Sequence, residues 1–127
     1  MIKPDNFKEI NDRYGHEAGD HVLKLMAIFL QSELGENDIG VRYRGDEFAA
    51  VLADAGRDEA LERARSISSS IASLDLARAA GPDAPAIRLS VGVALYPSGV
   101  AESRALVEEA HRKMTAARES GGGRVAI

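Results

Sequence analysis

The sequence contains no cysteine and no tryptophan, and aromatic residues make up only 5% of its 127 positions. Without cysteine, disulfide bonds and cysteine-ligated zinc sites are excluded, and the cytoplasm is the expected compartment. No apolar run approaches membrane-spanning length, and the N-terminus lacks the apolar core of a signal peptide. We therefore expect a soluble single domain, large enough to bury a core without disulfides or a structural metal.

Basic residues are in deficit: 16 lysines and arginines face 20 acidic residues, which gives a formal net charge of −4. Nucleic acids and anionic membranes are bound by clusters of lysine and arginine that displace counterions. Neither is expected as a partner of this segment. The histidines His16, His21 and His111 do not have the spacing of a metal site.

Apolar residues recur at helical spacing in some segments and in strand-like patterns in others. Two strand-like segments flank Gly45-Asp46, which predicts a β-hairpin with these residues in the turn. The continuous apolar run at 48–52 is typical of a buried strand, whereas strict alternation at 87–95 predicts one face on the core. The expected helices are 4–14, 18–34, 60–74 and 106–117, the expected strands 39–44, 48–52, 87–95 and 124–127, with a loop at 78–85.

The order of these elements favours an α/β (α+β) fold with a single domain over residues 1–127. Because a hairpin pairs its strands antiparallel, the sheet cannot be all parallel. We expect a mostly antiparallel central sheet flanked by helices on one or both faces. If their strands pair, the Gly45-Asp46 turn and the Lys3-Pro4-Asp5 segment lie side by side at one edge.

The most informative segment is Tyr43-Arg44-Gly45-Asp46-Glu47-Phe48, which places two adjacent carboxylates at the tip of the hairpin. Gly45 permits a positive φ and lets a ligand approach the main chain. Asp46 and Glu47 offer the oxygen ligands that Mg²⁺ prefers when it also holds a phosphate. By itself the pattern is more typical of an ordinary polar turn. A metal-assisted phosphate site needs support from the rest of the chain.

That support comes from five separated motifs that agree in order and spacing with a known family. They are Asn-Phe-Lys-Glu-Ile-Asn-Asp at 6–12, Tyr-Gly-His at 14–16, Gly-Asp at 19–20, Arg-Tyr-Arg-Gly-Asp-Glu-Phe at 42–48 and Ser-Val-Gly-Val at 90–93. Together they resemble the GGDEF family, the diguanylate cyclases that join two GTP molecules into cyclic di-GMP. The resemblance covers nearly the whole chain and implies a palm-like, nucleotidyl-cyclase-like fold with the hairpin at the active edge.

The resemblance also implies a site and partners. Asn11 and Asp20 match the residues that read the guanine edge, and Asp46 and Glu47 match the catalytic carboxylates that hold Mg²⁺ or Mn²⁺. Each subunit holds one GTP, so a homodimer is implied, with pyrophosphate as the leaving group. The implied role is bacterial second-messenger signalling under a fused or partner sensory domain. The other implied substrate-binding residues are Phe7, Lys8, Arg44, Gly45 and Arg118.

The departure that bears most on catalysis is Lys3, which stands where the family has a metal-binding aspartate. An ammonium removes a ligand and repels Mg²⁺. It could instead contact the triphosphate, or it could be a solvated lysine at a frayed terminus. Arg44 replaces a usual glycine of the signature, a familiar variant that need not abolish activity.

Other departures concern the product-inhibition site and the residues that bind the phosphates of GTP. Gly35 replaces the arginine of the Arg-x-x-Asp product-inhibition motif, so no strong feedback inhibition is expected, and Asp38 is interpreted as a turn residue. Arg118 replaces a phosphate-binding lysine and Gly122 an arginine, while Arg124 could reach in. By this resemblance, the family's N-terminal helix and most of its first strand are expected to be missing from the chain. A central sheet position is therefore expected to be vacant or filled by another chain.

Three functions are compatible with this sequence. The first is a diguanylate cyclase, favoured by the intact carboxylate pair. The second is a degenerate module that binds GTP without turnover and regulates a partner domain, favoured by Lys3 and Gly122. The third, a pure dimerisation scaffold, leaves the guanine-reading residues without a purpose.

Overall fold

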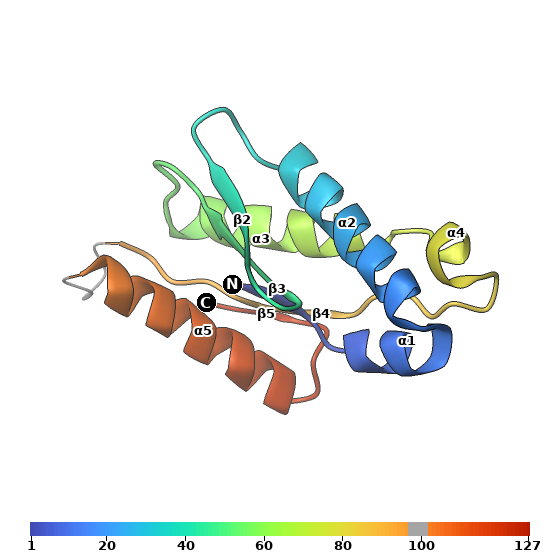
Figure 1. The fold of residues 1–127 in the computed structure, drawn as a ribbon. Helices are drawn as coiled ribbons and strands as arrows, with labels where there is room; N and C mark the ends of the chain where they lie inside the picture. Colours follow the sequence, from blue (N-terminus) through green and yellow to red (C-terminus); the bar gives the residue numbers. More distant parts are fainter. Residues whose placement is uncertain (97–101) are drawn as a thin grey trace.

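A computed structural model describes residues 1–96 and 102–127. Within these residues the sheet has five strands in the order β2-β3-β1-β4-β5, and only the β4–β5 pair is parallel. The mostly antiparallel sheet and its helical layers confirm the expected fold class (Figure 1). The strands are β1 Ile2–Pro4, β2 Ile39–Arg44, β3 Glu47–Val51, β4 Leu89–Gly92 and β5 Val125–Ala126.

Helices cover both faces of the sheet. Figure 1 shows α2 and α3 on one face and α5 on the other, with α1 leading from β1 into α2. The short helix α4 overlaps the start of the segment 78–85, which was expected to be a loop. The helices are α1 Phe7–Tyr14, α2 His16–Ser32, α3 Arg57–Ala72, α4 Ala77–Ala80 and α5 Ser103–Glu119.

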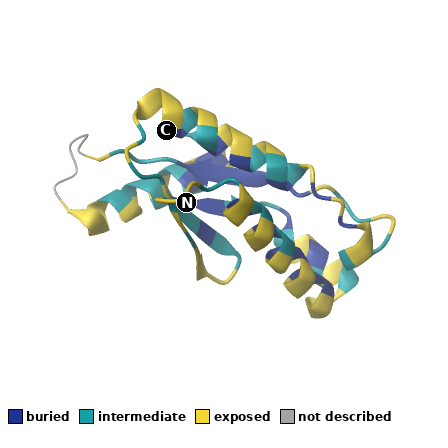
Figure 2. Cartoon of the chain, turned by 90° about the horizontal axis from the view of Figure 1, so that it is seen from above, coloured by how far each residue is buried: buried dark blue, intermediate teal, exposed yellow. Residues whose placement is uncertain are grey.

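The core lies between the sheet and the inward faces of the helices, because each amphipathic helix buries its apolar stripe. Ile10 of α1, Met26 of α2 and Ile71 of α3 are fully buried together with Phe48 and Leu89 of the sheet. Figure 2 shows this pattern as buried central strands between helices with exposed outer faces. The apolar spacing therefore identified the core faces of the helices.

Several strand predictions need correction. Pro4 ends strand β1 instead of beginning a helix, because the chain stays extended through β1 and α1 starts only at Phe7. The apolar run of β3 is not buried throughout: Phe48 is 2% exposed, but Val51 is 60% exposed, because β3 pairs with the solvent-facing edge strand β2. The predicted strand 87–95 is shorter, and β4 is buried on both faces because it lies between β1 and β5 under α3 and α5.

The central position of the sheet is not vacant. Strand β1 fills it, pairing antiparallel with β3 at Ile2↔Phe48 and with β4 at Ile2↔Val91. The three residues of β1 therefore hold the hairpin β2–β3 onto the rest of the sheet. No second chain is needed to complete this position.

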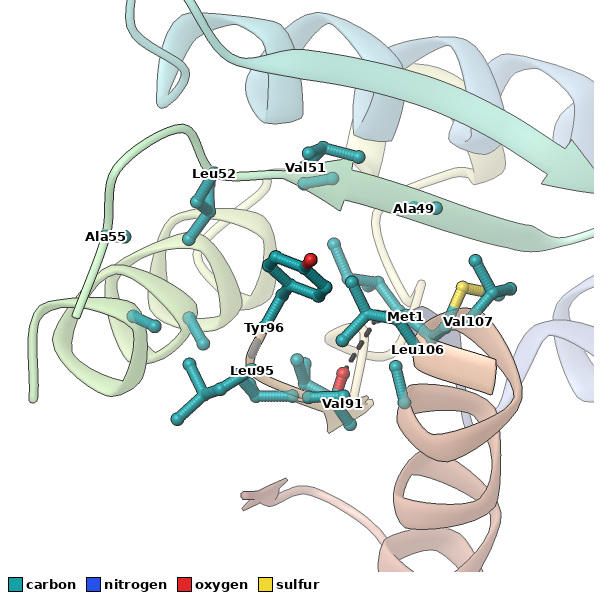
Figure 3. Close-up of a pocket in the computed structure, with 18 of the residues that line it drawn as sticks. Met1, Ala49, Val51, Leu52, Ala55, Val91, Leu95, Tyr96, Leu106 and Val107 are labelled. Carbon is teal, nitrogen blue, oxygen red and sulfur yellow. Dashed lines mark hydrogen bonds between the residues drawn. The ribbon is translucent and has the colours of Figure 1, made fainter. Parts of the chain in front are cut away.

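An apolar pocket of about 580 Å³ lies between the end of β3, α3 and α5. Figure 3 shows Val51 and Leu52 on one side of it, Leu106 and Val107 on the other, and Tyr96 between them. Asp54 is the only acidic side chain among its described lining residues. The pocket lies at the opposite end of β3 from the hairpin turn, so it is separate from the carboxylates of the signature.

Candidate functional site

The register of the sheet brings Lys3 to the hairpin turn. Because β1 runs antiparallel to β3 from the Ile2↔Phe48 pair, the C-terminal end of β1 approaches the turn at Gly45 and Asp46. Side chains alternate along a strand, so burial of Ile2 and Pro4 on one face leaves Lys3 on the other. The turn and the Lys3–Asp5 segment thus lie side by side, as the sequence predicted.

Lys3 is held by both signature carboxylates. Its Nζ atom lies 2.5 Å from Asp46 Oδ1 and 3.6 Å from Glu47 Oε1. The side chains of Lys3 and Asp46 are only 16% and 21% exposed. The interpretation of Lys3 as a solvated lysine at a frayed terminus is therefore wrong, because strand pairing fixes its backbone and an ion pair fixes its ammonium.

The second carboxylate, Glu47, faces two further basic groups. Its Oε2 atom lies 3.4 Å from Arg44 Nε and 3.3 Å from His111 Nε2. This oxygen is buried and has no hydrogen-bond donor among the described residues. His111 lies on α5 and was not predicted as a site residue, because the spacing of the three histidines does not indicate a metal site. Only the packing of α5 brings it to the hairpin.

The residues as placed do not fit a divalent ion. Asp46 Oδ1 and Glu47 Oε1 both face the ammonium of Lys3, and Glu47 Oε2 faces Arg44 and His111. In the described part of the chain, no three acidic or histidine side chains form a group that could hold a metal. A doubly charged ion about 4 Å from an ammonium would be repelled by roughly 8 kcal/mol at an effective dielectric constant of about 20.

The residues expected to read guanine lie on adjacent helices. Asn11 is on α1 and Asp20 on α2, and the two helices pack together. Gly19 permits this packing, because a Cβ atom there would lie 1.8 Å from Asn11 Oδ1 and 3.2 Å from Phe7 Cζ. Asn11 therefore lies directly over the residue that precedes Asp20, with Phe7 packed beside it.

The residues expected to read guanine, Asn11 and Asp20, lie at the same edge of the fold as the hairpin turn. Helix α1 begins at Phe7, directly after the end of β1 that lies beside the turn. Among the described residues, no hydrogen bond or ion pair engages the amide of Asn11 or the carboxylate of Asp20, and Asp20 is exposed. An amide and a carboxylate so placed can donate to and accept from the polar edge of a base.

Two of the predicted substrate-binding residues lie apart from these groups. Lys8 is 88% exposed and its Nζ atom pairs with Asp12 Oδ2 at 2.5 Å on the outer face of α1. Arg118 is exposed in the last turn of α5. Arg124, which the sequence suggested as a substitute, donates from Nε to the carbonyl of Gly122 at 3.3 Å.

Asp5 connects the site to the C-terminal glycine segment. Its carboxylate accepts hydrogen bonds from Ser90 Oγ at 2.6 Å and from the Gly123 amide at 2.8 Å. Gly122 has a φ of +69°, and a Cβ atom there would lie 2.6 Å from Asp5 Oδ2. The absence of a side chain at Gly122 thus allows Asp5 to approach this loop.

Asp38 is more than the turn residue that the sequence suggested. Its carboxylate accepts from the amides of Gly35 at 2.7 Å and Ala53 at 2.9 Å and pairs with Arg63 of α3. The hydrogen bond from Arg63, followed by those from the two amides, holds the pKa of Asp38 well below its ordinary value. Asp38 therefore ties both ends of the hairpin to α3.

This pairing gives a testable dependence of stability on pH. Because the native pKa of Asp38 is lowered, its stabilising effect is complete above the unfolded pKa of about 4 and is lost as the pH falls further. We expect the unfolding midpoint in urea to be lower for Asp38→Asn than for the unmodified chain at neutral pH. That difference should shrink steadily below about pH 4. Asp83→Asn, at an exposed loop position, is the matched control, and a difference independent of pH would contradict the assignment.

Comparisons with known proteins place this chain in a family. The family model described as diguanylate cyclase, GGDEF domain, matches residues 1–124. The chain is 35% identical over 127 residues to diguanylate cyclase DosC of Escherichia coli strain K12, and 39% identical over 125 residues to diguanylate cyclase TpbB of Pseudomonas aeruginosa. The match to DosC covers all of this chain but only 27% of DosC. The match to TpbB covers 97% of this chain but only 28% of TpbB. These relatives are larger proteins with room for further domains.

Solved structures agree with the fold described above. The GGDEF domain of TpbB (YfiN) from Pseudomonas aeruginosa superimposes with a TM-score of 0.89 at 36% identity, covering 98% of this chain and 77% of that one. The GGDEF domain of DgcB from Caulobacter crescentus, solved in complex with c-di-GMP, gives 0.90 at 27% identity, covering 98% and 73%. Within residues 1–96 and 102–127, no helix has the length and apolarity to cross a membrane. The chain belongs to the GGDEF domain family of diguanylate cyclases.

Proposed function

We propose that this domain binds GTP, with its guanine on Asn11 and Asp20 and its triphosphate toward the hairpin turn. The observation that carries the proposal is the shared edge: β1 ends beside the turn, and α1 follows directly with Asn11 over Gly19. Guanine offers both donors and acceptors on its edge, which an amide and a carboxylate together can match. A base with the opposite pattern would leave them unpaired.

We further propose that two such domains, facing each other as a homodimer, condense two GTP molecules to cyclic di-GMP. In each of two steps, a 3′-hydroxyl oxygen forms a bond to the α-phosphorus of the other GTP, the bond to the β-phosphate breaks, and pyrophosphate leaves. The hydroxyl proton passes to a base, for which Asp46 and Glu47 are the carboxylates at this edge. Lys3 and Arg44 supply positive charge for the phosphates. We also propose that a fused or partner sensory domain controls this domain and that the protein segment lies in the cytoplasm.

A second function is favoured by one contact. The 2.5 Å ion pair between Lys3 and Asp46 engages a carboxylate that a cyclase would use, which supports GTP binding without turnover and regulation of a partner domain. Incubation with GTP, followed by chromatography for cyclic di-GMP, separates the two. Product from the unmodified chain that disappears in Asp46→Ala supports the cyclase, whereas product only from Lys3→Asp supports the silent GTP-binding module.

The guanine contacts can be tested without turnover. We expect Asn11→Ala to weaken GTP binding about 10- to 100-fold, because it leaves polar atoms of the base unpaired. Gly19→Ala should weaken it similarly, because the new Cβ atom would overlap Asn11 Oδ1 and displace that side chain. Calorimetric titration measures both effects, with Asn37→Ala at an exposed turn as the matched control. Unchanged GTP affinity in both variants would contradict the guanine assignment.

A further inference from the structure

We propose that Lys3 is a built-in cation that takes the place of the divalent ion, so that the triphosphate of GTP binds here without Mg²⁺. This inference rests on the proposed GTP site and concerns the charge that the site supplies. Relatives in this family generally use a divalent metal. In this chain, the ammonium of Lys3 lies 2.5 Å from Asp46 Oδ1, where such an ion would need that oxygen.

Strand pairing fixes the backbone of Lys3, and the ion pair with Asp46 fixes its ammonium. Lys3 is the middle residue of β1, which is the central strand of the sheet, and its backbone pairs with Ser90 of β4. Its side chain is only 16% exposed and lies against the carboxylates of Asp46 and Glu47. A lysine held in this way is a cation that is part of the protein, unlike an ion that exchanges with the medium.

The basic side chains around the hairpin already balance the charge of its two carboxylates, so no further cation is needed there. Asp46 and Glu47 contribute two negative charges, and Lys3 and Arg44 contribute two positive charges within 3.6 Å of them. His111 adds a third basic group at 3.3 Å from Glu47. The carboxylates are therefore already neutralised, and an entering Mg²⁺ would have to displace the ammonium from Asp46.

The same basic groups retain the capacity to bind phosphate. An ammonium has three hydrogen-bond donors, and Asp46 and Glu47 engage at most two of those of Lys3. Arg44 is 65% exposed, faces Glu47 through Nε and stacks over the ring of Tyr43, and its exposed guanidinium can donate to phosphate oxygens. Charge-assisted hydrogen bonds from Lys3 and Arg44 would neutralise part of the negative charge of a triphosphate that carries no metal ion.

The test compares GTP binding by calorimetry in excess Mg²⁺ and in excess EDTA. For the unmodified chain we expect the two dissociation constants to agree within about threefold, because the cation is covalently part of the protein. Lys3→Asp should bind GTP at least about tenfold more tightly with Mg²⁺ than with EDTA, because it restores a carboxylate ligand. Arg65→Asp, which makes the same change of charge at an exposed position of α3, should behave like the unmodified chain.

A second measurement uses the metal alone. Titration with Mn²⁺, followed by electron paramagnetic resonance in the absence of nucleotide, should show no bound ion on the unmodified chain and one on Lys3→Asp. Circular dichroism establishes whether the variants are folded. If Lys3→Asp does not fold, Lys3→Asn removes the positive charge without adding a negative one. GTP binding that is lost in EDTA, or Mn²⁺ bound by the unmodified chain, would overturn the inference while leaving the GTP site intact. Absence of GTP binding in both buffers would overturn both proposals.

Discussion

Replacing Asp46 by asparagine is expected to lower cyclic di-GMP formation by about 10²- to 10³-fold, the range found when a preorganised electrostatic group is lost from a catalytic site. Asparagine keeps the shape of the side chain but removes the charge that positions Lys3 Nζ at 2.5 Å. The ammonium then no longer has a fixed place next to the reacting phosphate. Chromatographic assay of product against time, at saturating GTP, measures the effect.

GTP binding should respond differently from turnover. Asp46→Asn removes a negative charge near the triphosphate, so we expect the affinity for GTP to be unchanged or higher. Asp83→Asn, which makes the same chemical change in an exposed loop, should alter neither quantity. Equal losses of binding and turnover would indicate that Asp46 only maintains the fold, and undiminished turnover would exclude a catalytic role for this carboxylate.

Gly92→Ala is expected to destabilise the fold by about 3 kcal/mol or more, because β4 and α5 touch at this residue through their backbones. A Cβ atom at Gly92 would lie 2.0 Å from the Ala110 carbonyl oxygen and 2.3 Å from the Met114 amide nitrogen. Backbone atoms of a packed helix cannot move aside as the end of a flexible side chain can. The strand and the helix would have to separate, which also opens the core around Met114.

Urea unfolding followed by circular dichroism measures this loss. A domain of this size is stabilised by only about 5–15 kcal/mol, so the midpoint should fall by a large fraction of its original value. Gly56→Ala is the matched control, because a Cβ atom there meets nothing within 4 Å. A midpoint for Gly92→Ala equal to that of Gly56→Ala would show that α5 does not pack on β4 as closely as described.

Local sequence patterns predicted the elements whose signals are local. The hairpin followed from two strand-like segments around Gly45, which indeed has a positive φ of +49°. Helical spacing gave the position of each long helix to within a few residues. The predictions were wrong where packing outweighs pattern, as for β4, whose alternating residues are all buried because helices cover both of its faces. Pro4 was misassigned because proline fits both a helix start and a strand end.

The sequence by itself determined the family and the mostly antiparallel fold, and it predicted Asp46 and Glu47 as site residues, because these depend on motifs and on periodicity along short segments. Only the tertiary structure decided how the site is charged. Lys3 meets Asp46 across 43 positions of the chain, Arg63 meets Asp38 across 25, and His111 meets Glu47 from a separate helix. Such contacts are set by strand register and helix packing, which no local pattern contains. The physical consequence is a pair of acidic residues that the sequence presents as metal ligands and that the fold neutralises with its own lysine.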